Sequence, residues 1–253
     1  DGQYAETIEA FVKRGGKLLV SGTSGLEDGR SIIPGMPLEH LGRSGYDVRY
    51  LRMKDSGIFP KVPETDHVLY EAGEQVSGDG TVLAEIINPY FSRTYEHFCS
   101  HRQTPPKRES DGEPAILETA SGIYMAFPVF RMYTDSGYTV YRDLTEGCIR
   151  RLLERPLIET DLPAITELSL RCQGNDLILH MLNYVVTGKA KMLDTIEEKY
   201  MVKDKAVRIR TAHSPAGVIR LPSCEAVQFH YEDGYTEIKM DCLSGYEAFL
   251  IKQ

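Results

Sequence analysis

The pattern of hydrophobic and polar positions predicts a helix followed by a buried strand at the start of the chain. Four apolar side chains share one helical face there: Tyr4, Ile8, Phe11 and Val12. Gly15-Gly16 is a stop signal for this helix, and the run KLLV at 17–20 reads as a strand covered on both faces. This order is typical of a doubly wound α/β sheet, and we expect the strand ahead of the helix to lie outside the chain.

The middle of the chain carries fewer regular patterns. Residues 27–80 are rich in Gly, Pro and charge and are expected to be irregular, with short extended pieces at 46–53 and 68–70. Residues 81–91 and 114–130 read as strands, the second as a hairpin that turns at Ser121-Gly122. An amphipathic helix is predicted from Thr139 to Arg155, with Tyr141, Leu144, Cys148 and Leu152 on its apolar face.

After residue 160 the period changes from helical to alternating. Val227, Phe229 and Tyr231 lead into Asp233-Gly234, and a second alternating run follows, which is a strong hairpin signal. Short strands at regular spacing without helices between them are typical of a β-sandwich. We therefore predict two domains: an α/β domain over 1–158, flavodoxin-like or class I amidotransferase-like and truncated at its amino end, and an all-β immunoglobulin-like sandwich over 159–253.

The composition of the chain argues against nucleic acid and membranes as binding partners. The 253 residues carry a formal net charge of −8, which does not favour nucleic-acid binding. No apolar run approaches the ~20 residues of a membrane span, and the opening DGQYAETIEAF lacks the basic start of a cleavable signal sequence. The five cysteines are an odd number without repeated spacing, so we expect reduced thiols and a cytoplasmic location.

The segment YEHFCSHRQTPP, residues 95–106, holds the densest candidate chemistry. In a strand, His97, Cys99 and His101 would project from one face, but residues four apart lie ~13 Å from each other at ~3.3 Å per residue. His97 and His101 are then too far apart to share a zinc ion at ~2 Å from each ligand. We expect a half-buried strand with hydrogen-bonded histidines and no metal.

Sequence signatures of a catalytic nucleophile are missing. None of the five cysteines lies in the G-x-C-x-G elbow of amidotransferases, and the chain has no G-x-S-x-G. SGTSG at 21–25 lacks the Lys-Ser/Thr of a P-loop and the third glycine of a dinucleotide fingerprint. Cys148 reads as a small apolar residue of a helix. We expect no catalytic residue and no cofactor in this chain.

Several stretches together resemble a known family: FVKRGGKLLVSGTSG, NPYFSRTYEHFCSHRQTPP, YMAFPVFRMYTDSGYTVYRDL and DLILHMLNYVV. They are similar to the carboxyl-terminal half of bacterial glycoside hydrolases labelled galactosidases, a branch that includes α-L-fucosidase-like enzymes. Such enzymes carry an amidotransferase-like trimerisation domain followed by a small β-sandwich. The resemblance extends from about Tyr4 to Leu250.

The resemblance implies that catalysis belongs to a (β/α)₈ barrel upstream of this chain, and it assigns no catalytic residue here. The chain would support assembly of a homo-oligomer, a dimer or a trimer, and shape the rim of the active site that binds the carbohydrate substrate. Under this hypothesis, Tyr95, His97, His101 and Arg102 face the barrel or a neighbouring subunit. The alternative is that the segment serves folding alone.

Two other functions stay open. A free-standing amidotransferase-like enzyme would need a nucleophile elbow ahead of Asp1. A carbohydrate-binding module would hold sugar on exposed aromatic residues of the sandwich, for which Tyr231, Tyr235 and Tyr246 are the candidates. The lack of Trp speaks against this module.

Overall fold

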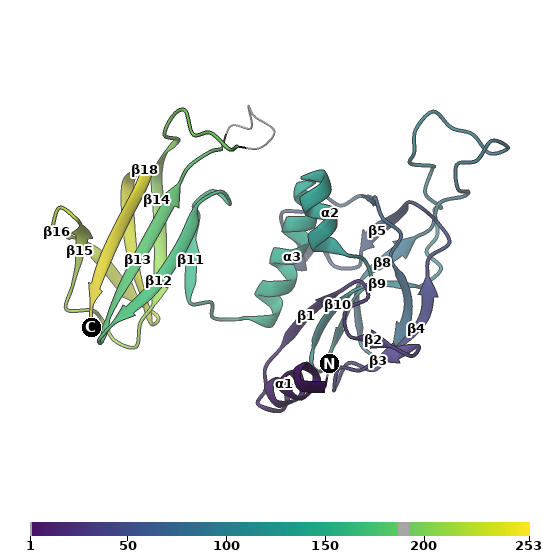
Figure 1. Cartoon of the computed structure of the whole chain (residues 1–253), viewed down its shortest axis with the longest axis horizontal. Helices are drawn as coiled ribbons and strands as arrows, with labels where there is room; N and C mark the ends of the chain where they lie inside the picture. Colours follow the sequence, from purple (N-terminus) through teal and green to yellow (C-terminus); the bar gives the residue numbers. More distant parts are fainter. Residues whose placement is uncertain (1, 187–192) are drawn as a thin grey trace. The chain divides into compact units, whose positions relative to one another are not determined.

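The computed structural model describes residues 2–186 and 193–253, and the chain divides into two compact units, Asp1–Glu154 and Arg155–Gln253. Each unit has its own hydrophobic core and is described by itself (Figure 1). The sequence-based domain boundary at 158/159 lies in strand β11 (Ile158–Thr160), near the start of the second unit. Within the described residues, no helix has both the length and the apolar character needed to cross a bilayer.

The first unit is built on a six-stranded sheet in the order β1-β10-β9-β8-β5-β6. Its strands are β1 (Leu18–Ser21), β5 (Arg49–Met53), β6 (His67–Leu69), β8 (Thr81–Ile87), β9 (Pro114–Thr119) and β10 (Gly122–Met125). β1 runs parallel to β10, and the other neighbouring strands are antiparallel. The β9–β10 hairpin turns at Ala120-Ser121, one residue from the predicted position.

Different layers cover the two faces of this sheet. On one face lie α2 (Val129–Ser136), α3 (Thr139–Leu152) and the short 3-10 helix η1 (Ser56–Ile58), which pack against Leu51, Ile116 and Ile123. On the other face lies a four-stranded sheet of β2 (Leu26–Glu27), β3 (Arg30–Ser31), β4 (Leu38–Arg43) and β7 (Glu74–Gly78). A second core that includes Met36, Val76 and Tyr124 fills the space between the two sheets.

The structure does not support the prediction of a flavodoxin-like α/β domain. A doubly wound fold needs parallel strands joined by helices that cover both faces of the sheet. Here tight connections such as the β9–β10 hairpin make most neighbouring strands antiparallel, and a small sheet takes the place of the second helical layer. Helix α1 (Gly2–Lys13) and strand β1 do form where the apolar pattern predicts them.

The second unit is all-β, and the prediction of a sandwich fits it. Its strands are β11, β12 (Glu167–Gln173), β13 (Asp176–Asn183), β14 (Met201–Arg210), β15 (Gly217–Leu221), β16 (Glu225–Val227), β17 (Phe229–Glu232) and β18 (Tyr235–Lys252). The predicted hairpin at Asp233-Gly234 is confirmed, because Glu232 pairs with Tyr235 across it. Leu179, Val207 and Phe249 belong to the core.

The long strand β18 belongs to both parts of the sandwich. Its residues 235–244 pair with β14, and residues 245–251 pair with β13. The change of partner occurs at Gly245, whose φ of 76° is in the left-handed region that favours glycine. This glycine therefore lets one strand continue from one part of the sandwich into the other.

Candidate functional site

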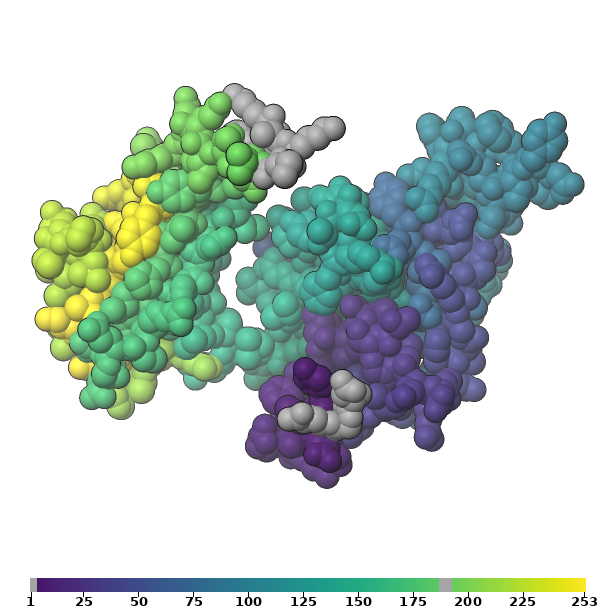
Figure 2. Space-filling view, in the orientation of Figure 1, coloured from purple at the N-terminus to yellow at the C-terminus, as the bar shows by residue number. Residues whose placement is uncertain are grey.

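The connection between β8 and β9 is a long loop, residues 88–113, that stands out from the first unit (Figures 1 and 2). Its two arms are joined close to the sheet by a bridge between Pro89 and Pro106. The Tyr90 amide donates to the Pro105 carbonyl at 3.0 Å, and the Lys107 amide donates to the Asn88 carbonyl at 2.9 Å. Prolines have no N–H to extend a ladder, so regular pairing stops at this neck.

Thr104 fixes the arms to the sheet. It is buried, and its hydroxyl donates to the Phe91 carbonyl at 2.6 Å. The Thr104 carbonyl accepts a hydrogen bond of 2.5 Å from the Tyr50 hydroxyl of β5. Burial raises the pKa of Tyr50, which keeps this hydroxyl protonated as a donor. The loop thus projects from a defined neck that is anchored in the sheet.

Beyond the neck, the tip of the loop exposes aromatic side chains. Tyr95 is fully exposed, and the exposed fraction of Phe98 is 73%; at the neck, Tyr90 is 59% exposed. The backbone at the tip is ordered by a local turn, in which the Thr94 amide donates to the His97 carbonyl at 3.0 Å and the His97 amide donates to the Thr94 hydroxyl at 3.1 Å. Aromatic residues are enriched at interfaces because they bring large contact areas at low cost in conformational entropy.

The structure places Tyr95, His97, His101 and Arg102 in this loop, and the expectation of a half-buried strand for His97, Cys99 and His101 is wrong. Their segment has irregular backbone, and all four side chains are exposed. Alternation of residue types mimics a strand here, but the prolines at the neck prevent β8 from continuing into the segment.

The four predicted site residues have separate surroundings. The Arg102 guanidinium donates to the Tyr70 carbonyl at 3.2 Å, and the His97 ring lies 5.9 Å from the Phe91 ring, centroid to centroid. The Cys99 thiol donates to the His101 carbonyl at 3.0 Å. Sequence reasoning missed Phe98 at the tip and Tyr90 at the neck as exposed aromatic residues, although aromatic residues in a polar, proline-flanked segment were an available signal.

A metal or thiol site receives no support from the geometry. Among residues 2–186 and 193–253, no three His, Cys, Asp or Glu side chains are grouped to hold a metal ion. Cys148 is buried in α3, as predicted, and burial raises the pKa of its thiol to about 12, with the Glu118 charge adding to the rise. A thiol with this pKa stays protonated and is a poor nucleophile.

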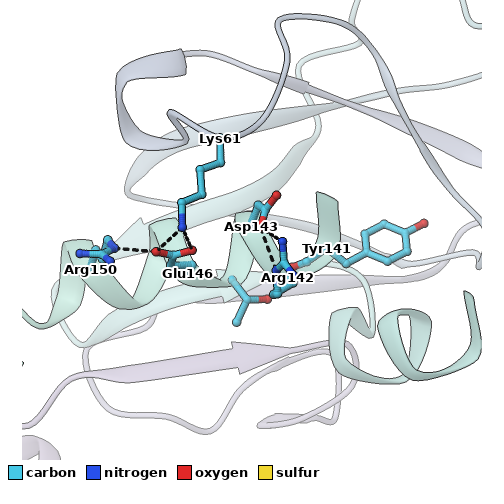
Figure 3. Close-up of polar contacts among 7 residues, drawn as sticks. Lys61, Tyr141, Arg142, Asp143, Glu146 and Arg150 are labelled. Atoms are coloured by element: carbon cyan, nitrogen blue, oxygen red, sulfur yellow. Dashed lines mark hydrogen bonds and ion pairs between the residues drawn. The ribbon is translucent and has the colours of Figure 1, made fainter. Parts of the chain in front are cut away.

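The charged cluster along α3 is also a structural feature. The Glu146 carboxylate accepts hydrogen bonds from Lys61 at 2.7 and 3.0 Å and from Arg150 at 2.9 Å (Figure 3). Arg142 pairs with its neighbour Asp143 at 2.9 Å. Carboxylates that are paired in this way stabilise the helix and its contact with the loop between η1 and β6, which carries Lys61, and we assign no chemistry to them.

The three tyrosines considered for sugar binding on the sandwich do not share one environment. Tyr235 is buried, and the Arg208 guanidinium lies 4.6 Å from its ring centroid. Tyr246 is half-exposed and forms a 2.7 Å hydrogen bond with His180. Tyr231 is partly buried, and its hydroxyl donates to the Ala212 carbonyl at 3.4 Å.

Comparisons with known proteins give structural relatives only. No protein-family model matches the sequence, and no curated protein matches it. Among solved structures, α-L-fucosidase isoenzyme 2 from Paenibacillus thiaminolyticus superposes with a TM-score of 0.89 at 27% identity, over 98% of this chain. Two β-galactosidases share the fold. One, from Bacillus circulans sp. alkalophilus, has a TM-score of 0.52 and 15% identity over 98% of this chain. The other is Gan42B, a GH42 enzyme from G. stearothermophilus, with a TM-score of 0.56 and 13% identity over 100% of this chain.

These relatives are much longer than the chain described here. The chain spans 38% of the fucosidase chain and 31% and 30% of the two β-galactosidase chains. The structural neighbours are thus glycoside hydrolases, and the chain is similar to one region of them.

Proposed function

We propose that this chain is a non-catalytic region of a larger glycoside hydrolase, in which the β8–β9 loop contacts the catalytic barrel or a neighbouring subunit at the rim of the active site. The bond-breaking groups belong to a (β/α)₈ barrel upstream of the chain. In the same proposal, the enzyme is a cytoplasmic homo-oligomer, a dimer or a trimer, that acts on a fucoside or a galactoside.

The likeness to the fucosidase is the observation that carries this proposal. The match covers 98% of the chain with a TM-score of 0.89, so both units, with their order along the chain, have counterparts in one glycoside hydrolase. Most of the fucosidase chain lies outside the matched region. This leaves room for a catalytic barrel elsewhere in the parent of the present chain.

The chemistry of the loop tip supports contact with a sugar or a protein surface. Aromatic rings pack against the apolar faces of sugars and of protein interfaces, while Arg and His supply hydrogen-bond donors for hydroxyls and carbonyls. Tyr95, Phe98, His97 and His101 are exposed together in one loop. The anchored neck keeps this tip in a defined position, which lowers the conformational entropy lost on contact.

The test uses the full-length parent enzyme with Tyr95→Ala and with the double change His101→Ala, Arg102→Ala. Rates on nitrophenyl α-L-fucoside and β-galactoside are measured together with the oligomer size by light scattering. We expect kcat/KM on the preferred substrate to fall about tenfold, which corresponds to about 1.4 kcal/mol of lost transition-state stabilisation, or the oligomer to dissociate.

A matched control is Leu41→Ala, which removes an exposed apolar side chain from β4 of the same unit. This change is expected to leave kinetics and assembly unaltered. Wild-type kinetics and oligomer size in both loop variants would refute the role of the loop. Turnover of any glycoside by the isolated 253 residues would refute the non-catalytic assignment.

A further inference from the structure

Three arginine side chains gather around Glu71, which lies between β6 and β7. Arg131 of α2 donates to both oxygens of the Glu71 carboxylate, and its Nε lies 2.9 Å from Oε1. These hydrogen bonds lower the pKa of Glu71 more than burial raises it, and the charges of Arg43 and Arg102 lower it further, so both of these guanidiniums lie near the same carboxylate. Arg43 ends β4, and Arg102 belongs to the β8–β9 loop. We call Arg43, Arg102 and Arg131 the arginine cluster.

Two members of the arginine cluster are held in place by the fold. Nη2 of Arg102 donates to the Tyr70 carbonyl at 3.2 Å, and the Tyr70 amide donates to the hydroxyl of the buried Tyr141 at 3.3 Å. The two parallel hydrogen bonds from Arg131 to Glu71 fix its guanidinium in a similar way. Each guanidinium has five N–H groups, so both keep donors for another acceptor. Donors that are ordered in advance lower the conformational entropy lost on binding.

The arginine cluster is a local excess of positive charge on an acidic chain. Its three side chains are exposed. Within residues 2–186 and 193–253, neither Arg43 nor Arg102 forms an ion pair, and both oxygens of Glu71 are already bound by Arg131. The three positive charges therefore share Glu71, and Asp135 is a further negative charge that acts on Arg131. The whole chain, by contrast, has a net charge of −8.

We infer that the arginine cluster binds a carboxylate on the surface of a second copy of the subunit. Arginine is enriched at protein interfaces, and its planar guanidinium matches the geometry of a carboxylate. Two copies of a chain with a charge of −8 repel each other, so close contact between them is favoured where one copy presents positive groups to the carboxylates of the other. Arg102 also extends the cluster to the β8–β9 loop, for which contact with a neighbouring subunit is proposed above. The inference rests on that proposal in one respect, namely that the parent enzyme is a homo-oligomer.

The test replaces Arg43 in the full-length parent enzyme, because this arginine lies outside the β8–β9 loop. Arg43→Gln removes the charge and Arg43→Glu reverses it, and sedimentation velocity measures the dissociation constant between subunits. We expect Arg43→Gln to raise this constant about tenfold, which corresponds to about 1.4 kcal/mol, and Arg43→Glu to raise it further. The matched control is Arg171→Gln, which removes an exposed arginine of β12 in the second unit and should leave assembly unchanged. Each variant should keep the Tm of the 253-residue chain, since surface changes of this kind have little effect on folding.

Salt and small anions separate the possible results. Wild-type assembly should weaken between about 0.1 M and about 1 M NaCl, where the Debye length falls from ~10 to ~3 Å, and Arg43→Gln should reduce this dependence. A monomeric parent, or equal dissociation constants for Arg43→Gln and Arg171→Gln, would overturn the inference. So would calorimetric binding of sodium citrate to the chain that Arg43→Gln abolishes while assembly stays unchanged, because the ligand would then be a free anion. Wild-type kinetics in Tyr95→Ala would count against the rim role of the loop and leave this test unaffected.

Discussion

At the scale of single residues, one buried ion pair stands out in the first unit. Arg49 of β5 is fully buried and donates to the Glu113 carboxylate, which also accepts a 3.4 Å hydrogen bond from Gln75. Within the described structure, Nε and Nη1 of Arg49 have no hydrogen-bond partner. The positive charge of Arg49 therefore depends on one carboxylate for compensation.

This dependence predicts unequal effects of removing the two partners. Glu113→Gln leaves a buried guanidinium without its counter-charge, and we expect the free energy of unfolding to fall by about 3 kcal/mol. Arg49→Met removes the buried charge itself, while the Glu113 side chain keeps some access to water. We therefore expect a smaller loss for Arg49→Met. Urea denaturation measures both, and equal losses would contradict this account.

At the scale of elements, the contact between α3 and the loop that joins η1 to β6 has a defined pH dependence. Burial alone would raise the pKa of Glu146, but hydrogen bonds from Lys61 and Arg150 outweigh it, so the pKa lies below the ordinary value of 4.5 (Figure 3). A carboxyl with a lowered folded-state pKa stabilises the protein above its unfolded pKa. That contribution is lost as the pH falls through the folded-state value.

Glu146→Gln is therefore expected to lower stability at pH 7 by about 0.5 kcal/mol, a small value because water screens the pair. The difference from wild type should shrink as the pH falls below about 4.5. Denaturation curves across this pH range measure it. Glu154→Gln, which changes an exposed carboxylate just after α3, is the control and should leave stability at pH 7 nearly unchanged. A difference that is constant with pH would contradict the ion-pair explanation.

Strand β18 depends on a glycine at the point where it changes partner. A Cβ on Gly245 would lie 2.8 Å from the Tyr184 hydroxyl oxygen, and its φ of 76° is unfavourable for other residues. We expect Gly245→Ala to cost about 1–2 kcal/mol. Adding Tyr184→Phe should recover only part of the loss, because the backbone strain remains. Gly217→Ala in β15, with no heavy atom within 4 Å of its Cβ, is the control and should be nearly neutral.

Sequence patterns correctly predicted the elements that are encoded by residues close together in the chain. The Asp233-Gly234 hairpin and the helix that ends before Gly15-Gly16 depend on turn chemistry and period, and both form as predicted. The small sheet was missed because β2 and β3 have two residues each, too few to show alternation. In the candidate site, the sequence located the polar segment but not its backbone conformation. The segment forms a loop because regular strand pairing ends at the Pro89–Pro106 neck.

At the scale of the whole molecule, stability is divided between separate cores. The core under α2 and α3 and the core between the two sheets belong to the first unit, and the sandwich has a core of its own. Hydrophobic burial is the main favourable term in folding. Each unit is therefore expected to keep its structure largely by its own contacts.

Two large-to-small substitutions test this division. Leu144 of α3 and Met181 of β13 are both fully buried, one in each unit. Replacing either by Ala is expected to cost about 2–5 kcal/mol. Hydrogen exchange should show which unit is destabilised. Leu144→Ala should speed exchange in β8 and β9 of the first unit, and Met181→Ala should speed exchange in β14 and β18 of the second. If each substitution speeds exchange in both units alike, the chain unfolds as one cooperative body, and its cores are not independent sources of stability.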